Sequence, residues 1–280
     1  MKKLIIYIFT IVIIFSCSKE NKKENSLSNF NLKGSVKSVS TRAPGGILIE
    51  KRIYNIKGNQ VERKIGKGRR IIDKYDVNDN LIARLIYNTN DRDLKRKLIY
   101  KYDDNGNQIE RITYDSNETI EEKYIYKYDS NGNKIEDVKW YKNSNSESLL
   151  NTYKYDRNGN ITEQYWHRND GSVRTTNIYK YDRNGNLIEA NYNNNYSDKS
   201  RVNDTKYIYK YDDNGNKIES NKFDYMGNLL RKFTNKYEYD DKGNWIIKRD
   251  FSYDIIDSKM LFDGFQTRKI TYFEDKIKAK

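Results

Sequence analysis

A turn-like motif that recurs along most of the chain is the strongest constraint on its fold. The stretch YKYDDNGNQIE at Tyr100–Glu110 returns almost unchanged from Tyr126 and again from Tyr209. Successive copies are 21 to 30 residues apart, a period typical of chains that stack one supersecondary unit on the next. Counted at the tyrosine before each turn, the copies fall at Tyr54, Tyr75, Tyr102, Tyr128, Tyr155, Tyr181, Tyr211 and Tyr239.

The Asp and Gly of each copy have the chemistry of a tight turn. Asp103 can accept a hydrogen bond from the backbone two residues further on, and Gly106 supplies the left-handed conformation that closes the bend. A calcium loop of the EF-hand type needs its glycine two places later and an acidic twelfth residue, where this chain has Tyr114. We therefore predict structural turns and keep cation sites as the alternative. The predicted turn pairs are Asp103 with Gly106, Asp129 with Gly132, Asp156 with Gly159, Asp182 with Gly185, Asp212 with Gly215, and Asp240 with Gly243.

The apolar pattern favours one register for these hairpins. If Asp103–Gly106 is a four-residue loop, then Tyr100, Tyr102 and Ile109 share one face of the sheet. Lys101 and Glu110 then become diagonal neighbours of opposite charge on the other face. A three-residue loop with a glycine bulge fits the turn chemistry as well, but it would separate Ile109 from the tyrosines. We predict the four-residue loop, with Ile109 facing a core.

Weaker polar clusters between the main turns, such as DSNET and KNSNSES, divide each unit into two strands. No segment sustains an apolar period of 3.6 residues, so we expect almost no helix. Hydrophobic residues make up only 36% of the chain, but its 26 tyrosines suit half-buried sheet faces. We predict an all-β antiparallel meander of repeated hairpins, with roughly sixteen strands, twisted or curled into an open barrel-like or solenoid sheet.

The first residues have the pattern of a targeting segment. Lys2 and Lys3 precede an apolar run of twelve residues from Leu4, which is too short for a permanent membrane helix. The sequence IFSC, in which Ser16 precedes Cys17, resembles the lipobox of bacterial lipoproteins. The resemblance implies cleavage between Ser16 and Cys17 and a covalent lipid on Cys17. It also implies that the protein is located in the cell envelope, and the serine at position 18 implies an outer membrane. An ordinary secretory signal is the alternative, and the periplasmic or surface face stays open.

Three segments follow from these patterns. Residues 1–16 are predicted to be a lipoprotein signal peptide, residues 17–31 the acylated cysteine and a flexible polar tether, and residues 32–280 the β-repeat domain. Within that domain, YxYDxxGN repeated over about Tyr54 to Asn244 resembles the YD repeat of Rhs-type proteins. That resemblance implies a long coiled antiparallel sheet. The eight copies counted above suggest too few units to close a shell, so the toxin-enclosing role of that family is not carried over.

Few residues have the pattern of a catalytic or metal site. His167 is the only histidine and Cys17 the only cysteine, so zinc ligation would rest almost entirely on carboxylates. We predict no catalytic residues, no metal and no cofactor apart from the lipid. A glycoside hydrolase stays open as an improbable alternative, because the separation of two carboxylates is invisible in sequence.

The function expected from sequence is a non-enzymatic envelope lipoprotein that serves as a binding or scaffolding surface. The net charge of +13 would favour nucleic acid in a cytosolic protein, but an exported chain with interspersed charges is expected to bind none. The predicted partners are the membrane, through the lipid anchor, and an envelope glycan or protein. A carbohydrate-binding module is the alternative, with Trp140 and Trp166 as the possible glycan contacts.

Overall fold

The structure, a computed structural model, describes residue 27 and residues 30–66, 68–88, 93–141, 146–194, 204–254 and 259–273. These residues form 18 β-strands and a short 3-10 helix, η2 (Pro44–Gly46). The strands are β1 (Val36–Arg42), β2 (Leu48–Tyr54), β3 (Gln60–Ile65), β4 (Arg69–Tyr75), β5 (Leu81–Tyr87), β6 (Leu94–Tyr102), β7 (Gln108–Tyr114), β8 (Ile120–Tyr128), β9 (Lys134–Tyr141), β10 (Ser146–Tyr155), β11 (Ile161–His167), β12 (Val173–Tyr181), β13 (Leu187–Asn194), β14 (Thr205–Tyr211), β15 (Lys217–Phe223), β16 (Leu229–Tyr239), β17 (Trp245–Asp254) and β18 (Lys259–Tyr272).

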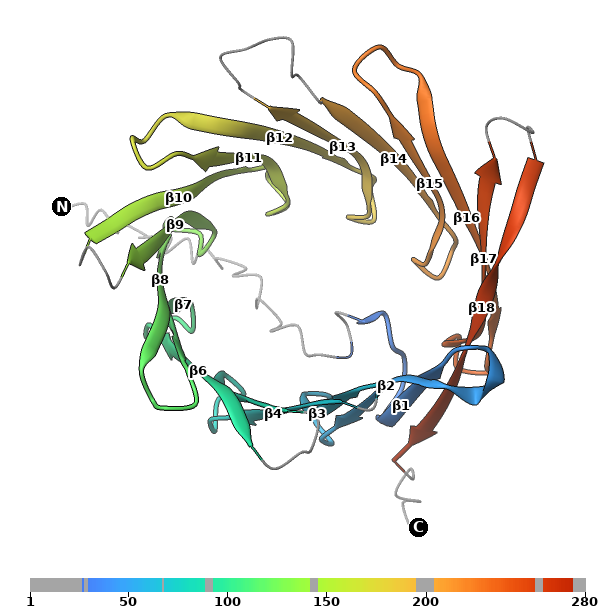
Figure 1. The fold of residues 1–280 in the computed structure, drawn as a ribbon, viewed down its shortest axis with the longest axis horizontal. Helices are drawn as coiled ribbons and strands as arrows, with labels where there is room; N and C mark the ends of the chain where they lie inside the picture. Colours follow the sequence, from blue (N-terminus) through green and yellow to red (C-terminus); the bar gives the residue numbers. More distant parts are fainter. Residues whose placement is uncertain are drawn as a thin grey trace, which may run out of the picture.

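The strands form one closed antiparallel barrel (Figure 1). Each described strand pairs with its neighbours in the sequence, and β18 pairs back with β1. The predicted all-β antiparallel meander is confirmed. The sheet closes fully into a barrel rather than staying an open barrel-like sheet. Closure has a physical advantage, because it leaves no strand edge with unpaired backbone groups.

The two kinds of turn lie at opposite ends of the barrel. Main turns connect β6 to β7, β8 to β9 and the later even-numbered strands to their successors, whereas looser turns connect the odd-numbered strands onward. We call these the main-turn end and the loose-turn end. In Figure 1 the main turns after β12 and β14 curve toward the centre of the ring, while the loose turn after β15 flares outward.

The main turns differ from the predicted loop by one residue. Tyr102 pairs with Gln108 and Lys101 pairs with Glu110, which leaves Ile109 as the extra residue of a β-bulge. The Asp103 N–H donates to the Asn107 carbonyl at 2.9 Å and the Gly106 N–H donates to the Asp103 carbonyl at 3.0 Å, which closes a loop of the three residues 104–106 with Gly106 in the left-handed conformation. The favoured four-residue loop is therefore wrong, and the three-residue alternative with its glycine bulge is confirmed. Ile109 does not face a core either, since 37% of it is exposed.

A tyrosine hydroxyl joins five of the hairpins to the preceding one. Tyr128 donates to the carbonyl oxygen of Gln108 at 2.7 Å, although Gln108 lies beyond the ladder of β7 with β8, which begins at Glu110. The phenol thus satisfies a carbonyl that the bulge leaves outside the ladder. Burial raises the pKa of Tyr128 to about 12, so the hydroxyl stays protonated as a donor. The same bond joins Tyr75 to Gln60, Tyr102 to Leu81, Tyr155 to Lys134 and Tyr211 to Leu187.

The segment before β1 packs inside the ring, where the barrel closes (Figure 1). Leu27 and Leu32 form a buried cluster with Val36, Val39 and Tyr54, and Ile270 and Tyr272 pack against it. Packing thus begins at Leu27, within the range predicted to be tether. These contacts place the N-terminal segment against β1, β2 and β18.

Polar contacts bind the same segment to the main turns. Asn31 donates to the carbonyl oxygen of Asn214, and the Lys33 backbone N–H donates to Asn244 Oδ1 at 2.6 Å. Asn244 Nδ2 in turn donates to the Lys33 carbonyl at 2.8 Å. The described chain therefore enters the barrel at its main-turn end.

Removing the hydroxyl of Tyr128 is expected to destabilise the barrel. Tyr128→Phe keeps the ring but leaves the Gln108 carbonyl without its partner, a loss of about 1–2 kcal/mol. Each kcal/mol lowers Tm by about 2–4 °C in a domain of this size. Thermal unfolding followed by circular dichroism measures the change. Tyr225→Phe is the matched control, because Tyr225 is 70% exposed in a loose turn. Equal Tm values for both variants would contradict a role of the hydroxyl in joining the units.

Candidate functional site

The two faces of the barrel wall differ in their side chains. Val39, Arg52 and Ile270 stand directly opposite one another on β1, β2 and β18, and the Arg52 guanidinium lies over the Phe30 ring at 3.5 Å. Phe30 belongs to the segment inside the ring, so this face is the inner one. Followed from strand to strand, the paired residues place Tyr100, Tyr126 and the other tyrosines before the main turns on the same, inner face.

The outer face carries rows of ion pairs between neighbouring strands. Glu110 binds Lys101 at 2.6 Å and Lys123 at 2.9 Å. Each exposed pair contributes little to stability, but the rows keep the outer face charged, with both signs interspersed. The lysine–glutamate pair expected from sequence is in contact, and other units repeat it, although Lys101 and Glu110 stand directly opposite rather than diagonally. The others are Lys127 with Glu136, Lys154 with Glu163, Lys180 with Glu189, and Lys210 with Glu219.

A row of hydrogen-bonded polar side chains crosses the inner face from β9 to β12. Asn151 donates to Asp137 at 3.2 Å, Gln164 donates to Asn151 at 3.5 Å, and Asn177 donates to Gln164 at 3.3 Å. The Asp137 carboxylate also accepts the Tyr153 hydroxyl at 2.5 Å and pairs with Lys134 at 2.8 Å. Burial, followed by this hydrogen bond to Asp137, raises the pKa of Tyr153. The row satisfies most of its buried polar groups, apart from Asn177 Oδ1, which is buried without a hydrogen-bond partner, so we interpret it as a structural feature of the wall.

The aspartates of the main turns spend both carboxylate oxygens inside their own loops. Asp103 Oδ1 accepts the N–H groups of Asn105 and Asn107, and Oδ2 accepts the Asn107 side-chain amide at 2.9 Å. The Asn107 side chain is the main cause that lowers the pKa of Asp103. Gly106 closes the loop at φ +81°. Asp129, Asp156 and Asp182 make the same contacts, whereas Oδ2 of Asp212 and of Asp240 accepts the hydroxyl of Tyr239 and of Tyr272 in place of the loop's own side-chain amide.

Neighbouring main turns stack against one another. Asn107 Oδ1 lies 3.5 Å from where a Cβ on Gly132 would stand, and Asn133 Oδ1 lies 3.7 Å from that point on Gly159. The same contact recurs at Gly185, Gly215 and Gly243. Among the described residues, no group of three or more His, Cys, Asp and Glu side chains is arranged to hold a metal ion.

The structure does not bring Trp140 and Trp166 together. Trp140 stands opposite Lys123 of the outer face, whereas Trp166 stands opposite Asn151 of the inner face. The two tryptophans therefore do not share one surface, and a glycan contact of each by itself stays a prediction. His167 bonds to Thr152 Oγ1 at 3.0 Å and to the Gly171 carbonyl at 3.1 Å. Ser16 and Cys17 lie outside the described residues.

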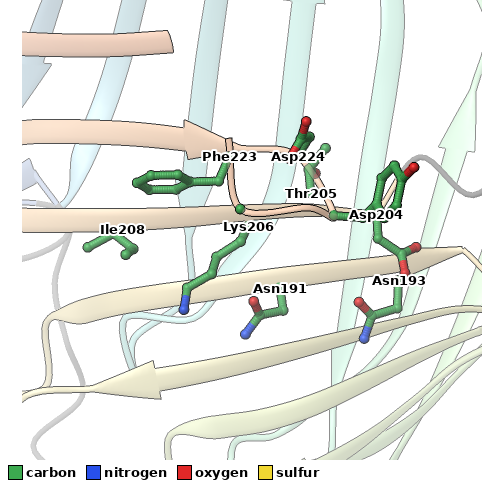
Figure 2. Close-up of a pocket in the computed structure, with 10 residues that line it drawn as sticks. Asn191, Asn193, Asp204, Thr205, Lys206, Ile208, Phe223 and Asp224 are labelled. Atoms are coloured by element: carbon green, nitrogen blue, oxygen red, sulfur yellow. The ribbon is translucent and has the colours of Figure 1, made fainter. Parts of the chain in front are cut away.

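A cleft of about 440 Å³ opens on the outer face near the loose-turn end. Its lining comes from β13, β14, the end of β15 and the β15–β16 turn (Figure 2). Asn191 pairs with Lys206, and Lys206 with Phe223, so these three residues form a row across three strands. Sequence reasoning missed this cleft, because its aromatic residues, Phe223 and Tyr225, come from a degenerate stretch, FDYMGN, that reads as a plain turn.

An ion-paired glutamate lies beside this cleft. Glu189 accepts Asn191 Nδ2 at 3.0 Å and pairs with Lys180 and Lys206, each at 3.0 Å. Its hydrogen bonds with Asn191 and Lys180, together with Lys206, lower the pKa of Glu189 to about 2. The network holds both Asn191 and Lys206 in position at the cleft.

Within the described ranges, no helix is long and apolar enough to cross a membrane. No protein-family model matches the chain, and no curated protein matches it. Solved structures do resemble it. A porin-like protein from Bacteroides uniformis is 8% identical over 85% of this chain and 99% of that one, with a TM-score of 0.46.

Toxin structures form the other group of neighbours. The crystal structure of TcdB2-TccC3 without its hypervariable C-terminal region is 12% identical over 80% of this chain, with a TM-score of 0.37. The Tc holotoxin pore of Photorhabdus luminescens is 14% identical over 76% of this chain, with a TM-score of 0.33. This chain covers 14% of each of these two chains. At such scores, the likenesses carry no argument about the function of this chain.

Acid is expected to destabilise the barrel through the ion-paired glutamates. The pKa of Glu189 and of Glu219 is about 2 in the fold, against about 4.3 in an unfolded chain. Because folding depresses these pKa values, their contribution is complete above pH 4.3 and is lost as the pH falls toward 2. The Tm of Glu189→Gln should therefore fall less steeply between pH 5 and pH 2.5 than that of the parent or of Glu147→Gln, an exposed control. Parallel curves for all three proteins would refute this linkage.

Proposed function

We propose that the protein is a non-enzymatic lipoprotein of a bacterial cell envelope, whose YD-type barrel serves as a binding or scaffolding surface. The observation that carries the proposal is the place where the chain enters the barrel. Leu27, Asn31 and Lys33 bind at the main-turn end, so a lipid on Cys17 would hold that end toward the membrane. The ten residues from Cys17 to Leu27 can span at most about 35 Å.

The outer face supports a barrel held beside the membrane in water. Its rows of lysine and glutamate, such as Lys101, Glu110 and Lys123, are exposed or half-buried and carry charges of both signs. Charged side chains facing lipid at the bilayer centre cost about 2–4 kcal/mol each, so this wall favours an aqueous setting. In this proposal the lipid alone holds the protein to the membrane, and two or more acyl chains suffice for that.

A tether at one end leaves the other end for partners. The loose-turn end lies away from the N-terminal segment and carries the cleft beside β13 and β14. The proposal therefore places the binding surface on the side of the barrel that faces away from the anchored membrane. For the carbohydrate-binding alternative, this cleft offers candidate contact residues other than Trp140 and Trp166.

The anchor is tested by replacing the cysteine. Cys17→Ser should move the protein from the membrane fraction to the soluble fraction of lysed cells and abolish incorporation of labelled palmitate, because no other cysteine can be acylated. Ser28→Ala is the matched control and should stay membrane-bound and labelled. Membrane retention of Cys17→Ser, at the level of the control, would overturn the lipoprotein proposal.

A further inference from the structure

We propose that the cleft of the loose-turn end binds a saccharide ring. The inference names a ligand class for the binding surface proposed above and rests on that function for its biological setting, while the cleft itself stands independently of the lipid. With about 440 Å³ of space, the cleft lies within the usual range for small-ligand sites, about 300–1,000 Å³.

One wall of the cleft is apolar and aromatic. In Figure 2 the Phe223 ring lies beside Ile208, with the row of polar residues next to them. Tyr225 adds a second aromatic ring at the rim, and 70% of this residue is exposed. An aromatic ring so little covered by its own protein is a surface on which a ligand can stack. The C–H face of a sugar ring is the matching apolar surface.

The other wall is lined by amides. Asn191 and Asn193 lie on the same side of β13, and in Figure 2 their carboxamides point the same way as the Lys206 ammonium. Each carboxamide carries both donors and an acceptor, which is what a ligand with several hydroxyl groups requires. Asn191 is held in place by Glu189. The Asn193 side chain makes no hydrogen bond with the described residues, so both its donors and its acceptor are available to a ligand.

The charges of the cleft favour a neutral ligand over an anion. Among the described residues that line the cleft, Lys206 is the one lysine. Its ammonium is paired with Glu189 at 3.0 Å. An anionic phosphate would have to compete with that carboxylate and would also meet Asp204 and Asp224. A neutral saccharide avoids this repulsion and uses the ring and the amides together. The geometry therefore selects sugars over phosphorylated ligands.

Titration with defined oligosaccharides tests this assignment. The full-length protein in detergent is titrated by calorimetry with two neutral probes, a tetramer of β-1,4-linked N-acetylglucosamine and a tetramer of β-1,4-linked glucose. We expect at least one probe to bind. Tyr225→Ala and Asn193→Ala should each weaken its affinity by about tenfold or more. Trp140→Ala and Trp166→Ala, on other strands, should bind as the parent does.

The outcomes separate the cleft from its alternatives and from the anchor. Absence of binding by both probes, or affinity unchanged in Tyr225→Ala and Asn193→Ala, would overturn the proposal, provided that circular dichroism shows both variants folded. Affinity lost only in Trp140→Ala or Trp166→Ala would overturn it in favour of those tryptophans. Cys17→Ser should bind the probe as the parent does, so failure of the cleft and failure of the anchor are distinguishable.

Discussion

The hydrogen bond that five of the main-turn tyrosines donate to the backbone beyond the preceding turn is the interaction on which the barrel depends. Strand pairing alone builds the hairpins and joins them side by side into the sheet. It does not fix the position of the bulged end of one hairpin relative to the bulged end of the next. Tyr102 and Tyr128 do so by reaching carbonyls that the ladder leaves unpaired. Phenylalanine could supply the ring but not the donor, which is why the repeat carries tyrosine. The bulge creates the unpaired carbonyl, and the tyrosine satisfies it, so each explains the presence of the other.

A barrel of this width cannot be held by one central core. Barrels of about 16–18 strands are too wide for side chains from opposite walls to fill, and the buried cluster around Leu27 and Val36 covers only the closure between β1, β2 and β18. Stability must therefore be spread around the wall, unit by unit, as in other repeat proteins. The inner polar row from Asp137 to Asn177 serves this purpose, as does the inner pair of Asp73 and Arg84, whose oxygen and nitrogen lie 2.6 Å apart. This accounts for a stable wall built from a sequence that is only 36% hydrophobic.

Sequence patterns predict local chemistry here better than register or sidedness. The fold class and the lysine–glutamate contacts follow from residue types and from the period of the repeat. The bulge at Ile109 does not, because the apolar pattern alone would place Ile109 on the face of the tyrosines. A single bulged residue reverses which face every later residue occupies. For this reason the opposite placement of Trp140 and Trp166 could not be read from the sequence, and neither could the row of Asn191, Lys206 and Phe223. Closure could not be predicted either, since it depends on the match between β1 and β18, 17 strands apart in chain order.

The two ends of the barrel are under different constraints, and this difference bears on where function lies. At the main-turn end, each loop contacts the next through its asparagine and glycine, so a change in one loop disturbs its neighbour and the loops stay alike. At the loose-turn end the described turns differ in composition, from residues 115–119 to the exposed turn at Asp224–Asn228, although these two have the same length and the same backbone hydrogen bonds. Turns without such mutual contacts can change without cost to the wall, which is the usual condition for a binding surface on a rigid scaffold. The cleft beside Phe223 and Asn193 lies at that end, while the N-terminal segment is bound at the other. The repeat thus supplies a uniform base and leaves the opposite rim free to specialise.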